Sequence, residues 1–316
     1  MKISLLFVFL LLSLSVAARA SGERTVAVTF DDLPFAAVPS DDDATLLAMT
    51  IKLLGDIHAQ GVPAVGFVNE AKLYRQGTLD EGRVRLLRLW LSAGIELGNH
   101  TYSHLSLNHV SLELFEADLL RGERITRPLM GSAGMRLRWF RYPYLHLGRT
   151  VEVRSAFREF LTARGYTIAP VTVNSAEWLF ALAYARAQAA GDRDAARQIG
   201  EAYVPYMASV FEDTEVLAFD LLGRNIPLVL LLHANTLNAD YFSALVSMLK
   251  RRGYRFVTLD EALRDPVYRS PIDADGHDGE SWLELLANQA GLPSPKMARL
   301  PKIVRQWAGP GAYRGY

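Results

Sequence analysis

Residues 25–34 read Thr-Val-Ala-Val-Thr-Phe-Asp-Asp-Leu-Pro, an apolar, β-branched run that ends in two adjacent carboxylates. The run predicts a strand over residues 25–30, with Asp31 and Asp32 at its end. Two adjacent acids at the end of a strand can have either of two roles. They can cap a following helix, because Asp is favoured at helix starts. Alternatively, one can bind a metal ion while the other removes a proton from a metal-bound water.

Strand-like and helix-like segments alternate along the rest of the chain. The strand-like segments are 25–30, 64–68, 96–98, 137–141, 167–173, 228–233 and 255–258. The helical patterns are 44–60, 82–93, 112–128, 151–164, a long stretch over 179–222, and 239–252. Because alternating strands and helices build a parallel sheet covered by helices, the sequence predicts a (β/α) barrel or an open, doubly wound sheet.

The pentapeptide His-Thr-Tyr-Ser-His at 100–104 follows one of the predicted strands. Two imidazoles four residues apart, on a helical turn or tight loop, project to one side and can hold a single divalent ion. The Glu of the H-E-x-x-H pattern is absent between them, so a catalytic base must come from elsewhere. The acids at residues 31 and 32 are an available source, which predicts metal-assisted hydrolysis.

Four candidate side chains lie at or just after the ends of predicted strands: Asp31, His100, Arg141 and His233. Parallel barrels collect their active-site groups at the carboxyl ends of the strands, so we expect these four to meet on one face. For Arg141 the alternative is an ordinary arginine at a strand end. For His233 it is a hydrogen-bonded histidine in the core.

Four separated motifs resemble those of the polysaccharide deacetylases of the NodB-homology type, also called carbohydrate esterase family 4. Thr-Phe-Asp-Asp at 29–32 is similar to the first family motif, and His-Thr-x-x-His at 100–104 to the second. Arg-Tyr-Pro-Tyr at 141–144 is similar to the third, and Leu-Leu-Leu-His at 230–233 to the last. The resemblance runs from residue 25 to 263 and implies an α/β fold, a distorted (β/α)7-type barrel.

The resemblance implies that Asp32, His100 and His104 hold a divalent metal and that Asp31 is the general base. Two imidazoles and one carboxylate, with a position open for water, suit Zn2+ best. Co2+, Ni2+ and Fe2+ would also fit such a ligand set.

The resemblance also implies roles for three further residues. Arg141 would pair with the base carboxylate and keep it ionised, because a neighbouring positive charge favours the charged form. The backbone N–H of Tyr144 would donate to the oxyanion, and Tyr144 would line the substrate site. His233 would be the general acid that protonates the leaving amine or alkoxide.

One motif departs from the family pattern. The family usually carries Asp just before a Trp, whereas this chain has Asn-Ser-Ala-Glu-Trp at 174–178. Glu177 is expected to orient His233 through one extra methylene, which leaves the geometry of the acid open. Trp178 is expected to form an apolar wall beside the acetyl group or, alternatively, to pack in the core.

The first residues predict export. Lys2 is followed by a mainly apolar run over 3–17 and by Ala18-Arg19-Ala20, an A-x-A cleavage pattern. We expect a signal peptide over 1–20, cut after Ala20, and a periplasmic or secreted protein without stable membrane insertion. An uncleaved N-terminal anchor is the alternative. The absence of cysteine agrees with either, since an oxidising compartment permits disulfides without requiring them.

The predicted organisation is a signal peptide, a catalytic domain over 24–265 with a helical insertion at 180–222, and a C-terminal extension over 266–316 that packs on the barrel. Without the leader, which carries Lys2 and Arg19 but no acid, Lys plus Arg falls from 34 to 32 against 34 acids, a net charge of −2. This balance argues against a nucleic-acid partner. The sequence does not define the oligomeric state.

These expectations combine into an exported, metal-dependent hydrolase of carbon–nitrogen bonds other than peptide bonds. It would remove acetyl groups, N-acetyl more than O-acetyl, from an acetylated glycan or oligosaccharide. Two alternatives stay open. One is an amidohydrolase that acts on a small molecule or cyclic amide with the same fold. The other is a non-catalytic carbohydrate-binding homologue. Sugar identity, linkage and chain length are not readable from the sequence.

Overall fold

The computed structural model describes residues 22–273, 278–293 and 298–312. The predicted signal peptide over 1–20 therefore lies outside the described residues. Within those three ranges, every helix is too short or too polar to cross a membrane.

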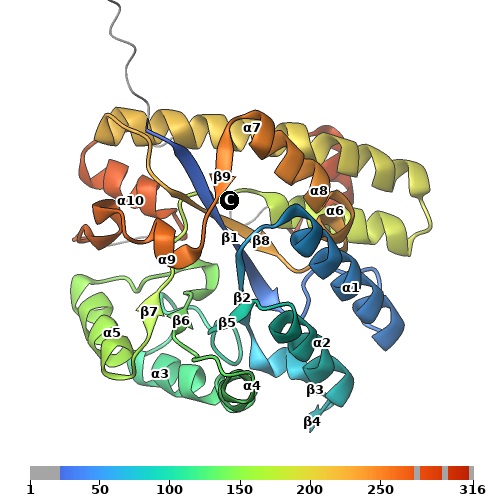
Figure 1. Cartoon of the computed structure of the whole chain (residues 1–316), viewed down its shortest axis with the longest axis horizontal. Helices are drawn as coiled ribbons and strands as arrows, with labels where there is room; N and C mark the ends of the chain where they lie inside the picture. Colours follow the sequence, from blue (N-terminus) through green and yellow to red (C-terminus); the bar gives the residue numbers. More distant parts are fainter. Residues whose placement is uncertain (1–21, 274–277, 294–297, 313–316) are drawn as a thin grey trace, which may run out of the picture.

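A curled, seven-stranded parallel sheet forms the centre of the molecule (Figure 1). Its strands are β1 (Arg24–Leu33), β2 (Ala64–Val68), β5 (Glu96–Asn99), β6 (Trp139–Phe140), β7 (Thr167–Ile168), β8 (Leu228–His233) and β9 (Tyr254–Phe256). The order is β7-β6-β5-β2-β1-β8, and β9 pairs with the first residues of β1. The predicted distorted (β/α) barrel is confirmed.

The segment after β7 connects the two edges of the sheet. A strand is predicted over 167–173, but only Thr167 and Ile168 pair with β6. The chain then crosses over, and Val173 forms a single parallel bridge with Leu230 of β8. Because residues 167–168 pair with β6 and Val173 bridges to β8, this segment links the two edges of the curled sheet, β7 and β8.

Helices surround the sheet (Figure 1). They are α1 (Asp43–Gln60), α2 (Glu81–Ser92), α3 (Leu112–Arg121), α4 (Thr126–Ser132), α5 (Val151–Ala163) and α8 (Thr236–Arg251). The single helix predicted over 112–128 is two helices, because α3 ends at Arg121 and α4 begins only at Thr126. At α1, the Asp42 side chain accepts a hydrogen bond from the Thr45 N–H and caps the helix.

The long helical stretch after residue 177 is also divided. It consists of α6 (Glu177–Ala189) and α7 (Arg193–Leu222), which pack on each other. The C-terminal residues add α10 (Trp282–Gln289), which packs on α7, and α11 (Lys302–Ala308), which packs on α6 and α7. Short elements complete the chain: the hairpin β3 (Tyr74–Arg75) and β4 (Thr78–Leu79), α9 (Leu259–Ala262), and the 3-10 turns η1 (Glu70–Leu73), η2 (Pro143–Leu145) and η3 (Pro266–Arg269).

The alternation of side chains along β1 divides the apolar residues between two cores. Val26, Val28 and Phe30 belong to the large core that the outer helices cover. Ala27 belongs to a smaller cluster with residues of β2, β6 and β8. Because successive side chains of a strand point to opposite faces, Thr29 and Asp31 share the face of Ala27 and point into the barrel.

Candidate active site

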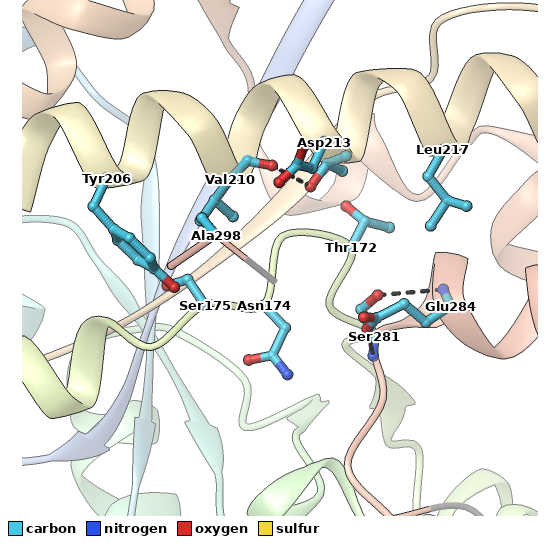
Figure 2. Close-up of a pocket in the computed structure, with 11 residues that line it drawn as sticks. Thr172, Asn174, Ser175, Tyr206, Val210, Asp213, Leu217, Ser281, Glu284 and Ala298 are labelled. Atoms are coloured by element: carbon cyan, nitrogen blue, oxygen red, sulfur yellow. Dashed lines mark hydrogen bonds between the residues drawn. The ribbon is translucent and has the colours of Figure 1, made fainter. Parts of the chain in front are cut away.

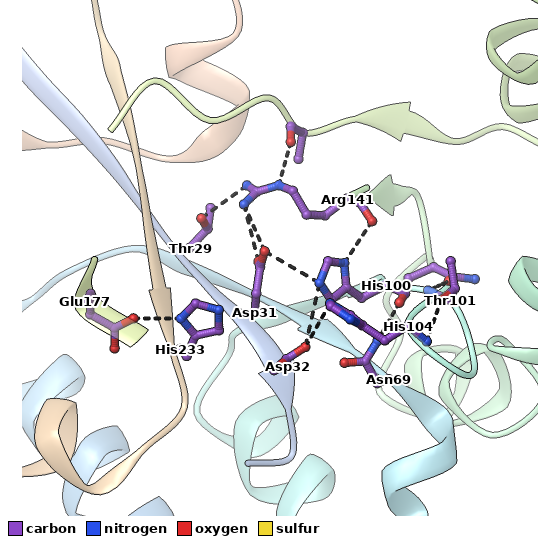
Figure 3. A network of polar contacts seen from close by, with 12 residues as sticks. Thr29, Asp31, Asp32, Asn69, His100, Thr101, His104, Arg141, Glu177 and His233 are labelled. Carbon is purple, nitrogen blue, oxygen red and sulfur yellow. Dashed lines mark hydrogen bonds and ion pairs between the residues drawn. The ribbon is translucent and has the colours of Figure 1, made fainter. Parts of the chain in front are cut away.

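Asp31 and Asp32 lie side by side at the end of β1 but do not follow regular strand geometry. The register of β1 against β2 shifts between Phe30 and Leu33. Asp32 has a φ of 67°, a left-handed conformation that non-glycine residues rarely adopt. This irregularity brings both carboxylates to the side of His100 (Figure 3). Neither acid caps a helix, since Asp42 has that role for α1.

Asp32, His100 and His104 form a cluster with the geometry of a metal site. Asp32 Oδ1 lies 3.7 Å from His100 Nε2 and 3.5 Å from His104 Nε2. The three donor atoms all lie within 4.8 Å of one another. Asp32 Oδ1 is buried without a hydrogen-bond donor. A buried carboxylate oxygen that faces two imidazole nitrogens fits a cation between them, so these residues suit the divalent ion implied by the resemblance.

The two histidines lie in the loop after β5 rather than on a helix. His100 donates from Nδ1 to the Arg141 carbonyl oxygen at 2.8 Å, which leaves the lone pair of Nε2 for a metal. Both Thr101 and His104 have positive φ values, 62° and 56°. The Thr101 hydroxyl accepts from the His104 N–H at 3.1 Å and closes the loop. Strained backbone of this kind clusters at functional sites.

The electrostatics of the cluster favour metal binding. Burial lowers the pKa of His100 to about 4 and that of His104 to about 3, so both imidazoles are neutral at pH 7. Burial opposes ionisation of Asp32, but Lys72 and the nearby histidines outweigh it and hold the pKa of Asp32 well below its ordinary value. Lys72 Nζ lies 3.1 Å from Asp32 Oδ2. The sequence did not point to this lysine, which comes from η1.

Arg141 and Asp31 form a buried ion pair beside the cluster. Arg141 Nη1 lies 3.3 Å from both carboxylate oxygens of Asp31, and the two residues are only 1% and 3% exposed. Arg141 also donates to the Ala169 carbonyl and to the Thr29 hydroxyl, at 2.6 and 3.2 Å, which fixes the guanidinium. Burial raises the pKa of Asp31, although Arg141 opposes that shift.

His233 occupies the other side of Asp31, as its register partner on β8. His233 Nδ1 donates to Glu177 Oε2 at 2.7 Å, so the extra methylene of Glu177 does reach the histidine. Burial alone would lower the pKa of His233. The carboxylate of Glu177, reinforced by Asp32 and Asp31, outweighs burial and raises that pKa to about 9. The imidazole is therefore cationic at neutral pH.

Two asparagines and a tyrosine complete the support of Glu177. Asn235 and Asn238 donate to Glu177 Oε1 at 2.6 and 2.7 Å. Asn238 donates also to the His233 carbonyl and accepts from the Tyr203 hydroxyl of α7 at 2.9 Å. Sequence reasoning missed all three residues. The only available signal was the polar Asn-Thr-Leu-Asn at 235–238, which follows an apolar strand and starts α8.

Tyr144 and Trp178 differ in their placement. Tyr144 lies in η2 with a φ of 57° and is 56% exposed, and its ring centroid is 4.3 Å from that of His104. It therefore borders the cluster. Trp178 is partly buried and packs against the large hydrophobic core, which agrees with the alternative interpretation of that residue.

A separate cavity lies between α7 and the start of α10 (Figure 2). Its lining contains none of the nine predicted site residues. The lining residues are Thr172, Asn174, Ser175, Tyr206, Val210, Asp213, Thr214, Leu217, Ser281, Glu284 and Ala298. Hydroxyl, amide and carboxylate groups line it without a grouping of histidines, unlike the network in Figure 3.

Residues 18–160 match the family model described as polysaccharide deacetylase. Several solved structures are similar over 77% of this chain. They include peptidoglycan deacetylase PdaC from Bacillus subtilis (20% identity, 92% of that chain, TM-score 0.47). A family 4 carbohydrate esterase from Streptomyces lividans in complex with acetate has 18% identity, 97% coverage of that chain and a TM-score of 0.44. A CE4 family pseudoenzyme from Bacillus anthracis has 15% identity, 66% coverage and a TM-score of 0.47. The search of the curated proteins found no match.

Proposed function

Because residues 18–160 match the polysaccharide deacetylase family model, we propose that this chain is an exported, metal-dependent deacetylase of an acetylated glycan, N-acetyl more than O-acetyl. The observation that carries the proposal is the arrangement of three groups around one point. Asp32 and the two histidines form a metal-type cluster, Asp31 lies beside it, and a cationic His233 lies next to Asp31.

In this proposal, Asp32, His100 and His104 hold the metal, and two imidazoles with one carboxylate suit Zn2+ best. When bound, the ion would polarise the acetyl carbonyl and make water a better nucleophile at neutral pH. The neutral state of both imidazoles supports this assignment, since protonated histidine cannot bind a metal.

Asp31 acts as the general base. Its Oδ2 lies 3.7 Å from His100 Nε2, at the edge of the cluster, where it can take a proton from the attacking water. Burial raises the pKa of this carboxyl and makes the carboxylate a better proton acceptor. Arg141 holds it in place through Nη1.

His233 acts as the general acid. Nδ1 is engaged by Glu177, so the proton for the leaving amine comes from Nε2. With a pKa of about 9, the imidazole carries that proton at neutral pH. The Tyr144 N–H donates to the developing oxyanion. One water adds to the acetyl carbon, the bond to the amine breaks, and acetate and the protonated amine leave.

The test is acetate release from N- and O-acetylated glycans and oligosaccharides, before and after treatment with a chelator. We expect release from the N-acetylated members, its loss with chelator, and its return with Zn2+. Turnover of cyclic amides without acetate release would favour the amidohydrolase alternative. If the protein binds glycans but releases no acetate with any added divalent metal, it is a non-catalytic carbohydrate-binding protein, and the proposal is overturned.

A further inference from the structure

The C-terminal residues 278–279 lie against the loop that carries Tyr144. Gly279 has a φ of 91°, and a Cβ added there would lie 2.9 Å from the Tyr144 carbonyl oxygen. Side-chain carbons do not approach a backbone oxygen that closely, so only glycine permits this contact between the two backbones. The contact joins a segment outside the matched residues 18–160 to the edge of the metal-type cluster.

Two asparagines fix the segment on either side of this contact. Asn174 Nδ2 donates to the Gly279 carbonyl at 3.1 Å. Asn108 Nδ2 donates to Asp278 Oδ1 at 3.3 Å, and Asn108 Oδ1 accepts from the Gly148 N–H at 3.0 Å. Asn108 therefore ties the C-terminal segment to the loop that follows Tyr144.

The turn itself needs such support. Tyr144 and Leu145 both have a φ of 57°, and two successive non-glycine residues in this region are costly unless the surroundings hold them. Tyr144 is 56% exposed, and its ring contacts those of His104 and His146 at the surface rather than packing in the core. As the second residue of a three-residue 3-10 turn, Tyr144 has no acceptor within the turn for its N–H, which stays available to a ligand.

We propose that Gly279 is a positioning residue of the active site. Its backbone holds the Tyr144 turn so that the Tyr144 N–H points to the oxyanion. The proposal rests on the proposed function, and it places the C-terminal segment within the catalytic structure. A side chain at position 279 would push the Tyr144 carbonyl away. Because that shift rotates the Tyr144 backbone, it would also turn the Tyr144 N–H, in the preceding peptide unit, out of alignment, while the acid and the cluster stay intact.

The experiment compares Gly279→Ala with Gly291→Ala in the metal-loaded full chain. Gly291 also lies in the C-terminal residues and also has a positive φ, 71°, but an added Cβ there meets nothing within 4 Å. In both variants an alanine must adopt a positive φ, which destabilises the folded chain. Only in Gly279→Ala does the new Cβ also collide with the Tyr144 carbonyl oxygen. We expect Gly279→Ala to lose about 10- to 100-fold in kcat, with KM, metal content and the alkaline limb of the pH profile unchanged. A kcat equal to that of Gly291→Ala would overturn the proposal.

Two further measurements cover the remaining cases. If Gly279→Ala does not fold, Asn174→Ala releases the segment without a collision. A kcat loss at an unchanged melting temperature then supports the proposal, and an unchanged kcat overturns it. If the wild-type protein releases no acetate, the proposed function fails separately. Hydrogen exchange of residues 142–148 is then the deciding measurement. Exchange rates in the Gly279→Ala or Asn174→Ala protein equal to those of the wild type would overturn the proposal that Gly279 holds the Tyr144 turn.

Discussion

Asp31 and Asp32 show how two identical, adjacent side chains acquire different chemistry. Asp31 points into the barrel, where burial raises its pKa. Asp32 turns out of the strand toward Lys72, whose positive charge helps to hold the pKa of Asp32 low against the effect of burial. Pairs of acids whose environments separate their pKa values commonly divide the roles of proton acceptor and fixed charge.

The different environments of Asp31 and Asp32 predict that replacing each with Asn will impair a different property, activity for Asp31 and metal binding for Asp32. Asp31→Asn should keep the metal and lose about 10²- to 10⁴-fold in kcat, because it removes a base but no proposed ligand. Asp32→Asn should lose metal itself. Elemental analysis of the purified variants, together with acetate release, checks both outcomes. Normal metal content and activity in both variants would contradict the assignment.

Glu177 predicts a shift in pH dependence. The carboxylate raises the pKa of His233 to about 9, so the protonated acid persists up to that pH. Glu177→Gln removes the negative neighbour, and the pKa of His233 should fall. The alkaline limb of the kcat profile should therefore move to lower pH. Glu70→Gln is the matched control, since Glu70 is another fully buried carboxylate but accepts from the backbone of Ile125 and Thr126. An unmoved limb in Glu177→Gln would show that another group positions the acid.

The strands and turns that hold the site residues could be predicted from the sequence to different degrees. The strands that carry Asp31 and His233 near their carboxyl ends have strong apolar patterns, so their positions and shared face could be predicted. The left-handed turn at Tyr144 and the support of Glu177 by Asn238 could not, because each depends on packing between segments far apart in the chain. The short hairpin Tyr74–Leu79 has too few residues to show a period.

α3 supports the loop between the two histidines. The Asp118 carbonyl accepts from the Tyr102 N–H at 3.1 Å, and its side chain accepts from the Ser103 N–H at 2.9 Å. At the end of the helix, a Cβ added to Gly122 would lie 2.5 Å from the Thr101 carbonyl carbon. The helix and the loop are therefore in backbone contact, which leaves no room for a larger residue.

This contact predicts that Gly122→Ala weakens metal binding without changing any ligand. Overpacking of this kind typically costs about 1–3 kcal/mol, and here it should also displace His104. Gly55→Ala is the control, because Gly55 lies within α1 and an added Cβ meets nothing within 4 Å. The control should be stabilised by about 0.5–1 kcal/mol. Urea unfolding and metal titration measure the two effects. Metal affinity equal to that of the control would refute the role of α3.

On the scale of the whole molecule, we propose that residues 24–265 form the catalytic domain, with most of α6 and all of α7 as a helical insertion at 180–222 and residues 266–316 as an extension. The insertion is not a detached element, because Tyr203 of α7 bonds Asn238 and α6 begins with Glu177. α11 in turn packs on α6 and α7. The acid therefore depends on the helical pair, whereas the metal-type cluster depends on the first half of the chain.

Metal binding should consequently stabilise the whole fold. Asp32, His100 and His104 come from β1 and from the loop after β5, and they converge only in the folded chain. An ion that binds the folded chain alone adds about 2.7 kcal/mol to the free energy of unfolding when its free concentration is 100 times Kd. Thermal unfolding with Zn2+ should therefore occur several degrees above unfolding with chelator. The double variant His100→Ala, His104→Ala should bind no metal, and Zn2+ should not raise its unfolding temperature. A full rise and one metal per chain in that variant would place the ion elsewhere.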